Sequence, residues 1–151
     1  MDQELRELYQ QVILDHNKSP RNFRLMENAT QHAEGYNPLC GDHVDIYLLI
    51  EDSFIKDVSF KGEGCAISKA SASLMTSILK GKTKEEAGKL FEKFHDLVTG
   101  KLGENVAIDE LGKLAVFAGV QEFPVRVKCA SLAWHTMMNA IKGEQEKVTT
   151  E

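Results

Sequence analysis

The sequence predicts an α+β fold in which a small antiparallel β-sheet packs against several α-helices. A helical pattern opens the chain and is followed, between residues 29 and 62, by segments with strand character. From residue 65 onward, apolar residues recur at helical spacing in several segments. A short turn at 51–53 joins the two clearest strands, and so short a connection pairs strands antiparallel. A chain of 151 residues suits one domain, which we expect to span residues 1–151.

The first predicted element is an amphipathic helix over residues 2–16. Leu5, Leu8 and Val12 recur there at helical spacing, and Pro20 prevents the helix from continuing. His16 falls at the C-terminal end, where a cation complements the helix dipole. We therefore interpret His16 as a structural residue and not as a metal ligand.

Three strands are expected next, over residues 29–36, 44–51 and 54–62. The second has apolar residues at alternate positions, as in a half-buried strand. The sequence then changes to a helical period from Cys65, and Gly81 is the expected C-terminal cap of that helix. Small residues form a second stripe on this helix, which would let it approach a neighbouring element closely.

Three further helices complete the prediction. One spans residues 84–98, with Thr83 and Glu86 in the positions of a capping box. The second begins near Asp109 and continues to residue 120, and the last begins at Pro124 and ends near residue 141. The polar tail from residue 143 onward is expected to be frayed and solvated.

Composition and charge exclude several classes of protein. A net charge of −5 argues against general binding of nucleic acids, which needs a basic surface. No apolar run approaches the roughly 20 residues of a membrane span. The polar, acidic start Met-Asp-Gln-Glu-Leu is unlike a secretory signal, so a cytoplasmic location is expected. Three cysteines cannot form a complete disulfide framework, which leaves metal binding, sulfur chemistry or plain burial.

Each cysteine lies at a turn or near the start of an element. Cys40 is on the turn before a strand, Cys65 follows Gly62 and Gly64 and opens a helix, and Cys129 lies early in the last helix. A thiol at a helix N-terminus has a lowered pKa, because the positive end of the helix dipole favours the thiolate.

The spacing alone leaves two interpretations open. The cysteines are 25 and 64 residues apart, unlike the close Cys-x-x-Cys pairs of zinc fingers. A shared site needs a fold that gathers three remote segments, and Asp42 could then supply a fourth, tetrahedral ligand for zinc or iron. The alternative is three unrelated thiols. His43 is a secondary candidate, because it should point away from Asp42 along the strand, and we interpret His135 as a structural or surface residue.

Four segments resemble a known family. The stretches "NPLCGDHVDIYL", "FKGEGCAISKASASLM" and "FPVRVKCASLAWHTM" are similar to the three cysteine segments of the IscU/NifU N-terminal family of iron–sulfur cluster assembly proteins. The opening "LYQQVILDHNKSPRN" resembles the family's first helix. The resemblance spans nearly the whole chain. Two details resemble the SufU-type branch: a long segment between Cys65 and Cys129, and Lys128 where IscU-type proteins carry a ligand His.

The resemblance implies a function and a set of residues. SufU-type proteins bind one zinc ion through three Cys and one Asp, which correspond here to Cys40, Asp42, Cys65 and Cys129. They accept persulfide sulfur from a SufS-type cysteine desulfurase and supply the downstream SUF assembly proteins. Cys40 would be the sulfur acceptor, and Arg126 matches a motif Arg that would support the partner complex.

Two other functions are kept beside this zinc-dependent sulfurtransferase. One is an iron–sulfur cluster scaffold, which would use the same residues to build and hand on a [2Fe–2S] or [4Fe–4S] cluster. The other is a structural zinc domain without transfer chemistry. The long Cys65–Cys129 segment and Lys128 favour the sulfurtransferase, because an ammonium group cannot bind a metal. We further hypothesise that the partner displaces Cys40 from the metal and frees it to react.

Overall fold

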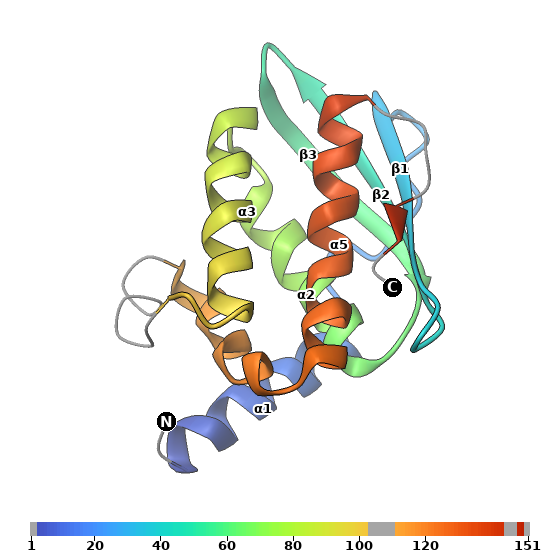
Figure 1. The fold of residues 1–151 in the computed structure, drawn as a ribbon. Coiled ribbons are helices and arrows are strands. Elements are labelled where there is room, and N and C mark those ends of the chain that lie inside the picture. Colours follow the sequence, from blue (N-terminus) through green and yellow to red (C-terminus); the bar gives the residue numbers. More distant parts are fainter. Residues whose placement is uncertain (1–2, 103–110, 144–147, 150–151) are drawn as a thin grey trace.

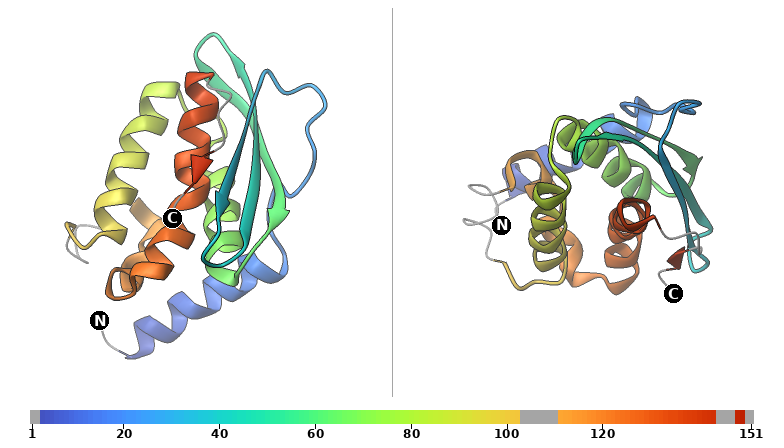
Figure 2. Two further views of the ribbon diagram at one scale, coloured as in Figure 1. Left: turned by 45° about the vertical axis from the view of Figure 1, so that its right-hand side comes forward. Right: turned by 90° about the horizontal axis from the view of Figure 1, so that it is seen from above.

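A computed structural model describes residues 3–102, 111–143 and 148–149 of the chain. The helices lie on one face of a curved sheet (Figures 1 and 2). The order is α1 (Gln3–Lys18), β1 (Gln31–Asn37), β2 (Asp42–Glu51), β3 (Phe54–Glu63), α2 (Ala66–Leu79), α3 (Lys84–Val98), the 3₁₀ helix η1 (Gly112–Glu122), α5 (Pro124–Lys142) and β4 (Val148–Thr149). The predicted α+β class, with an antiparallel sheet against several helices, is therefore confirmed.

The sheet has the strand order β3-β2-β1-β4. β2 pairs antiparallel with both β1 and β3, and its pairing with β3 was predicted from the short turn between them. Every second residue of β2 is buried from Asp42 to Leu48, because that face of the strand meets the helices. The expectation of a frayed tail is wrong for residues 148 and 149, which pair in parallel with Gly35 and Tyr36 of β1.

The helices form two layers. α5 lies across β1 and β2, α2 packs beside it against β3, and α3 covers α5 on the side away from the sheet (Figure 2). The small residues of α2 allow close approach on two sides. Ser73 Oγ lies 2.7 Å from His16 Nδ1 of α1, and Ser71 donates a 2.6 Å hydrogen bond to the carbonyl of Ala130 in α5. α2 is thus held tightly to both α1 and α5.

His16 is structural, although not for the reason expected. Its side chain is buried, and burial together with the nearby charge of Arg21 holds the pKa of His16 below its usual value. The ring is therefore the neutral partner of Ser73 and not a cation at the helix end. The capping box of α3 is confirmed: Glu86 N–H donates to Thr83 Oγ1 at 3.1 Å, and Thr83 N–H donates to Glu86 Oε1 at 2.9 Å.

The predicted α-helix before α5 is instead a 3₁₀ helix from Gly112 to Glu122. Gly112 has a φ of +54°, which a continuing α-helix does not allow, and Gly119 weakens the segment further. Asp109, near which this helix was expected to begin, lies outside the described residues. Within the described ranges, no helix is long and apolar enough to cross a membrane.

Candidate metal centre

Three segments that are remote in the sequence meet at one end of the molecule. The turn between β1 and β2, the start of α2 and the first turns of α5 all lie at the lower end of Figure 1. Asn37 and Asp42 are the last cross-strand pair before the turn at residues 38–41. This convergence favours a shared site over three unrelated thiols.

Asp42 is held rigidly at the centre of this cluster. Its side chain is fully buried, a rare situation for a carboxylate without partners. The backbone N–H of Cys65 donates to Oδ1 at 2.9 Å, and Asn37 Nδ2 donates to Oδ2 at 3.3 Å. A Cβ added at Gly64 would lie 2.6 Å from Oδ1, so the glycine makes room for the carboxylate. The start of α2 is thereby tied to the start of β2.

Cys40 and Cys129 are in direct contact but differ in accessibility. Cys40 is exposed on the turn, whereas Cys129 is 2% exposed within α5. Their sulfur atoms are 3.3 Å apart, and Asn37 Nδ2 lies 3.5 Å from Cys129 Sγ. The ligand atoms of Cys40, Asp42 and Cys129 all lie within 4.8 Å of one another. The structure therefore brings one reachable thiol against two buried groups.

Cys65 joins the cluster from the N-terminus of α2. It is the N-cap residue, and its half-buried Sγ accepts the backbone N–H of Ser68 at 3.4 Å. Its hydrogen bond with Cys129 lowers the pKa of Cys65 to about 6, against the effect of burial. The same bond and burial raise the pKa of Cys129. In the metal-free protein Cys65 is therefore the more acidic thiol of the pair.

The chemistry of these four residues suits a zinc ion. Three sulfur donors and one carboxylate oxygen make a tetrahedral set of the kind that zinc prefers, and a cluster of iron and sulfur also takes thiolates. Cys65 is not among the three residues whose ligand atoms lie within 4.8 Å of one another, although its thiol is near enough to Cys129 to change the pKa of both. Asp42 would supply the hard donor, and both of its oxygens already accept hydrogen bonds, Oδ1 from the N–H of Cys65 and Oδ2 from Asn37.

Arg126 lies outside the group formed by Cys40, Asp42, Cys65 and Cys129, which is called the thiol cluster below. It lies on the exposed first turn of α5, with its guanidinium carbon 4.4 Å from the centre of the Phe123 ring. Lys128 is half-buried directly before Cys129. His135 also lies elsewhere, against Phe91 of α3 at 5.1 Å between ring centres, which fits the structural role expected of it.

His43 lies on the opposite face of the sheet from Asp42, as the strand alternation predicts. Sequence reasoning overlooked Asn37 and the fit of Gly64 to Asp42. The signal for Asn37 was present: an Asn before Pro favours a turn in which the side chain bonds the backbone two residues on. Asn37 Oδ1 indeed accepts the N–H of Leu39 at 3.3 Å. The second role of Asn37, as donor to Asp42 and Cys129, depends on the fold.

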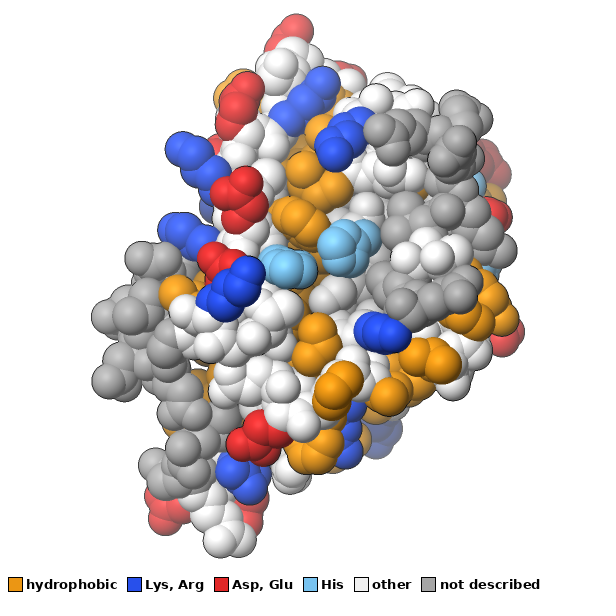
Figure 3. Space-filling view, in the orientation of Figure 1, with side chains coloured by type: hydrophobic (Ala, Val, Ile, Leu, Met, Phe, Trp, Pro, Cys, Tyr) orange, Lys and Arg blue, Asp and Glu red, His pale blue; other side chains and the backbone are white. Residues whose placement is uncertain are grey.

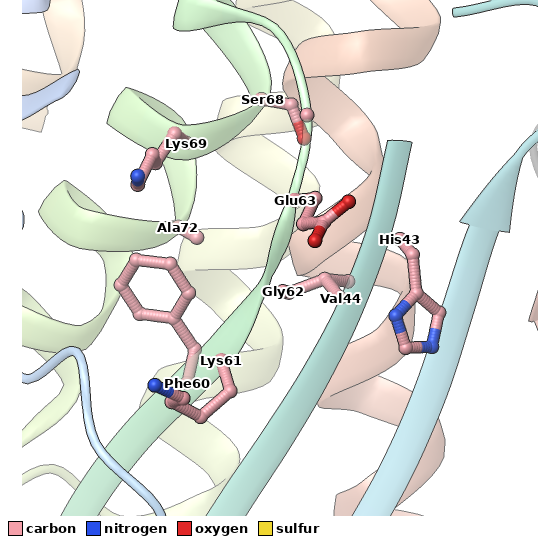
Figure 4. A pocket seen from close by; sticks show the side chains of 10 residues that line it. His43, Val44, Phe60, Lys61, Gly62, Glu63, Ser68, Lys69 and Ala72 are labelled. Atoms are coloured by element: carbon pink, nitrogen blue, oxygen red, sulfur yellow. The ribbon is translucent and has the colours of Figure 1, made fainter. Parts of the chain in front are cut away.

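A cleft lies next to this end of the molecule, between β3 and α2 (Figure 4). Gly64 and Ser68, which flank Cys65 in the chain, belong to its lining, but none of the three cysteines does. Lys61 and Lys69 lie on one side of it, and both ammonium groups sit over the Phe23 ring, at 4.3 and 5.0 Å. The cleft is therefore a neighbour of the thiol cluster and not part of it.

Comparison with known proteins gives a consistent result. Residues 8–130 match the family described as the NifU-like N-terminal domain. The iron-sulfur cluster assembly scaffold protein IscU of Streptococcus pyogenes serotype M1 is 41% identical over 138 residues, which cover 91% of this chain and 85% of that protein. The zinc-dependent sulfurtransferase SufU of Bacillus subtilis (strain 168) is 39% identical over 138 residues, covering 91% and 92%.

Solved structures agree with the fold. A crystal structure from Fervidobacterium islandicum AW-1, described as an iron-sulfur cluster assembly scaffold protein for the SUF system, superposes with a TM-score of 0.79. It is 40% identical and covers 86% of this chain and 93% of its own. A second crystal structure, of a hypothetical protein, gives a TM-score of 0.82 at 39% identity and covers 90% and 98%.

Proposed function

The chain belongs to the family of NifU-like N-terminal domains, and from this premise we propose that it is a zinc-dependent sulfurtransferase of iron–sulfur cluster assembly. It accepts persulfide sulfur from a SufS-type cysteine desulfurase and passes it to downstream SUF assembly proteins. Cys40 is the acceptor, and Cys40, Asp42, Cys65 and Cys129 hold the zinc ion. The family match, with relatives near 40% identity over most of the chain, supports a role in iron–sulfur cluster assembly.

The observation that carries the proposal is the contrast within one cluster. Cys40 is exposed on a turn, while Cys129 and Asp42 beside it are buried. A persulfide on another protein can reach a thiol on a turn, but it cannot reach one buried in a packed helix. A turn residue also moves at lower energetic cost than a helical one, because fewer packing contacts must be broken.

The transfer itself is thiol–persulfide exchange. The Cys40 thiolate attacks the outer sulfur of the desulfurase persulfide, and a new sulfur–sulfur bond forms at Cys40. The original sulfur–sulfur bond breaks, and the desulfurase cysteine leaves as a thiolate, so electrons and atoms balance without an added oxidant. When bound, zinc would keep the cysteine ligands deprotonated at neutral pH without oxidising them.

The surroundings of Cys40 suit a protein partner. Leu39 is 60% exposed beside it, and Phe123 and Val125 at the start of α5 are 45% and 49% exposed. Hydrophobic side chains gather around the lower end of α5 in Figure 3. Arg126 stands on Phe123 at this surface, where it would support the complex with the desulfurase. Aromatic residues and Arg are enriched in protein–protein interfaces, so Phe123 and Arg126 suit such a surface.

A cluster scaffold is the second candidate function. Two relatives named as iron-sulfur cluster assembly scaffold proteins IscU, from Streptococcus pyogenes and Thermotoga maritima, are 41% and 38% identical to this chain. The same thiolates could hold a cluster. Lys128 weighs against this role, because its ammonium group offers no ligand next to Cys129.

Turnover of cysteine by a SufS-type desulfurase separates the two functions. We expect the zinc-loaded protein to stimulate turnover, and we expect stimulation to vanish in Cys40→Ala and after chelation of zinc. Restored zinc should restore it in the wild-type protein. If the protein does not stimulate the desulfurase but forms a cluster spectrum when iron and sulfide are supplied, the scaffold function takes first place.

A further inference from the structure

We propose that the outer face of the sheet carries a second metal site, for a divalent first-row transition ion, formed by Glu34, His43 and Asp45. This site goes beyond the proposed sulfur transfer and contains no cysteine. It lies across the sheet from the thiol cluster, because successive residues of a strand point to opposite faces. Asp42 faces the helices, and the next residue, His43, faces outward.

The register of the sheet places the three side chains together. Glu34 of β1 is directly opposite Asp45 of β2. His43 precedes Asp45 by two residues on β2, so it shares the same face. Ala33 and Val44, the neighbours of these residues that point inward, are buried, which confirms that the three ligands point outward. The sheet therefore supplies a fixed frame for the cluster, unlike a mobile loop.

The distances suit one ion. His43 Nε2 lies 4.0 Å from Glu34 Oε1 and 3.9 Å from Asp45 Oδ2, and the three ligand atoms all lie within 4.8 Å of one another. Two donors bound to the same ion at 2.0–2.2 Å are separated by at most about 4.4 Å. Small side-chain rotations therefore bring all three atoms onto a single ion, with open positions left for water.

A second histidine orients one of the ligands. His32 Nε2 lies 2.9 Å from Asp45 Oδ1, and the His32 ring is stacked on Tyr47, with 4.6 Å between ring centres and 8° between planes. Asp45 thus uses Oδ1 for His32 and keeps Oδ2 on the side of Glu34 and His43. Ligating carboxylates in metal sites are commonly held by such a hydrogen bond, which sets their direction.

The two carboxylates favour a cation between them, although Lys61 of β3 also lies opposite Asp45. Two carboxylates directly opposite each other on a sheet repel and destabilise the pair. A protonated His43 would neutralise one charge, whereas a divalent ion would neutralise both. One imidazole with two carboxylates is a borderline donor set that suits zinc, iron, cobalt or nickel, while magnesium and calcium prefer oxygen donors alone. The thiol cluster selects softer ions, so the two sites differ in chemistry.

Cobalt titration of the zinc-loaded, full-length protein tests the proposal, with calorimetry for stoichiometry and visible absorption for ligand type. We expect one further Co²⁺ to bind with weak d–d bands and without thiolate-to-cobalt charge transfer. His43→Ala and Glu34→Gln should each weaken this binding at least tenfold. Glu51→Gln, at the far end of β2, removes an exposed carboxylate outside the cluster and should leave binding unchanged.

Three outcomes would overturn the proposal. They are no further Co²⁺ bound, Co²⁺ binding that survives both variants, or a thiolate charge-transfer band on the added ion. Glu34 is exposed, so Glu34→Gln keeps the test sound even if His43→Ala folds poorly. Zinc content and desulfurase stimulation report on the thiol cluster separately, so failure of this proposal leaves the proposed function untouched, and the reverse also holds.

Discussion

Cys40 and Cys129 touch each other, yet they belong to different kinds of structure. Cys40 is exposed on a turn outside any helix or strand. Cys129 is buried on a helix that crosses the sheet, and it is linked to Asn37 and Cys65. The difference shows how one site can combine two demands. The buried half fixes the geometry of the donors, and the exposed half offers a sulfur atom that a partner can reach.

Removal of Asp42 should have the largest effect on the buried half. In Asp42→Ala the N–H of Cys65 and the amide of Asn37 lose their acceptor inside the protein, which costs about 1–3 kcal/mol in free energy of unfolding. Zinc affinity should also fall, and by more than after substitution of any residue that supports the ligands without binding zinc itself. Urea unfolding of the metal-free protein and competition with a chromophoric chelator measure the two effects.

Cys40→Ala is the matched control for this comparison. It removes the exposed thiol on the turn and no buried group, so the metal-free variant should unfold at nearly the same urea concentration as the wild-type protein. A loss of stability in Cys40→Ala as large as that in Asp42→Ala would abolish the distinction between the two halves.

Asn37→Ala should come next, because Asn37 holds both Asp42 and Cys129 without being a ligand. Substitution of a residue that hydrogen-bonds to metal ligands typically lowers metal affinity by about 10–100-fold. The exposed Asn28→Ala serves as the control and should leave zinc affinity unchanged. Equal zinc affinities in the two variants would mean that Asn37 only shapes the turn.

Gly64→Ala should have a smaller effect of the same kind. The added methyl group would meet Asp42 Oδ1 at 2.6 Å and displace the carboxylate, and we expect a loss of about tenfold in zinc affinity, at the low end of the range for residues that support metal ligands. Gly88→Ala in α3 is the matched control, because its new methyl group meets only Met138 Cε at 3.9 Å. That variant should gain up to about 1 kcal/mol in helix stability. An unchanged zinc affinity in Gly64→Ala would show that the carboxylate has room to move.

The smallest expected effect concerns His16 of α1, which contacts Ser73 in α2, the helix that begins at Cys65. Burial lowers the pKa of His16, so below about pH 6.5 the unfolded chain binds a proton there that the native protein does not. Stability should therefore fall as the pH drops below that value. His16→Gln should flatten this part of the stability profile, although His135, whose pKa burial also lowers, keeps some of the slope. An identical pH slope in the variant would contradict the buried, neutral His16.

Local patterns predicted most of the fold. The alternation in β2, the capping box at Thr83 and Pro124 at the start of α5 each depend on neighbours in the chain, and each is confirmed. The 3₁₀ helix at 112–122 was predicted as a helix that begins near Asp109, and the positive φ of Gly112 shows only in the structure. The pairing of residues 148 and 149 with β1 could not be predicted, since so short a strand depends on a partner more than 100 residues away.

The site was predictable only in part. The family resemblance named Cys40, Asp42, Cys65 and Cys129, but spacing alone could not choose between a shared site and separate thiols. Asn37 was missed because its contacts with Asp42 and Cys129 join residues 5 and 92 positions away. The cluster of Glu34, His43 and Asp45 was missed for a similar reason. Glu34 lies opposite Asp45 only because of the register between β1 and β2.

The position of transferred sulfur tests the central claim most directly. The zinc-loaded protein would be incubated with a SufS-type desulfurase and cysteine, trapped with an alkylating reagent and mapped by peptide mass spectrometry. We predict one added sulfur atom on the peptide that contains Cys40, and none on the peptides with Cys65 or Cys129. Sulfur on Cys65 or Cys129 while Cys40 stays unmodified would contradict the division into a reactive turn and a fixed, buried half.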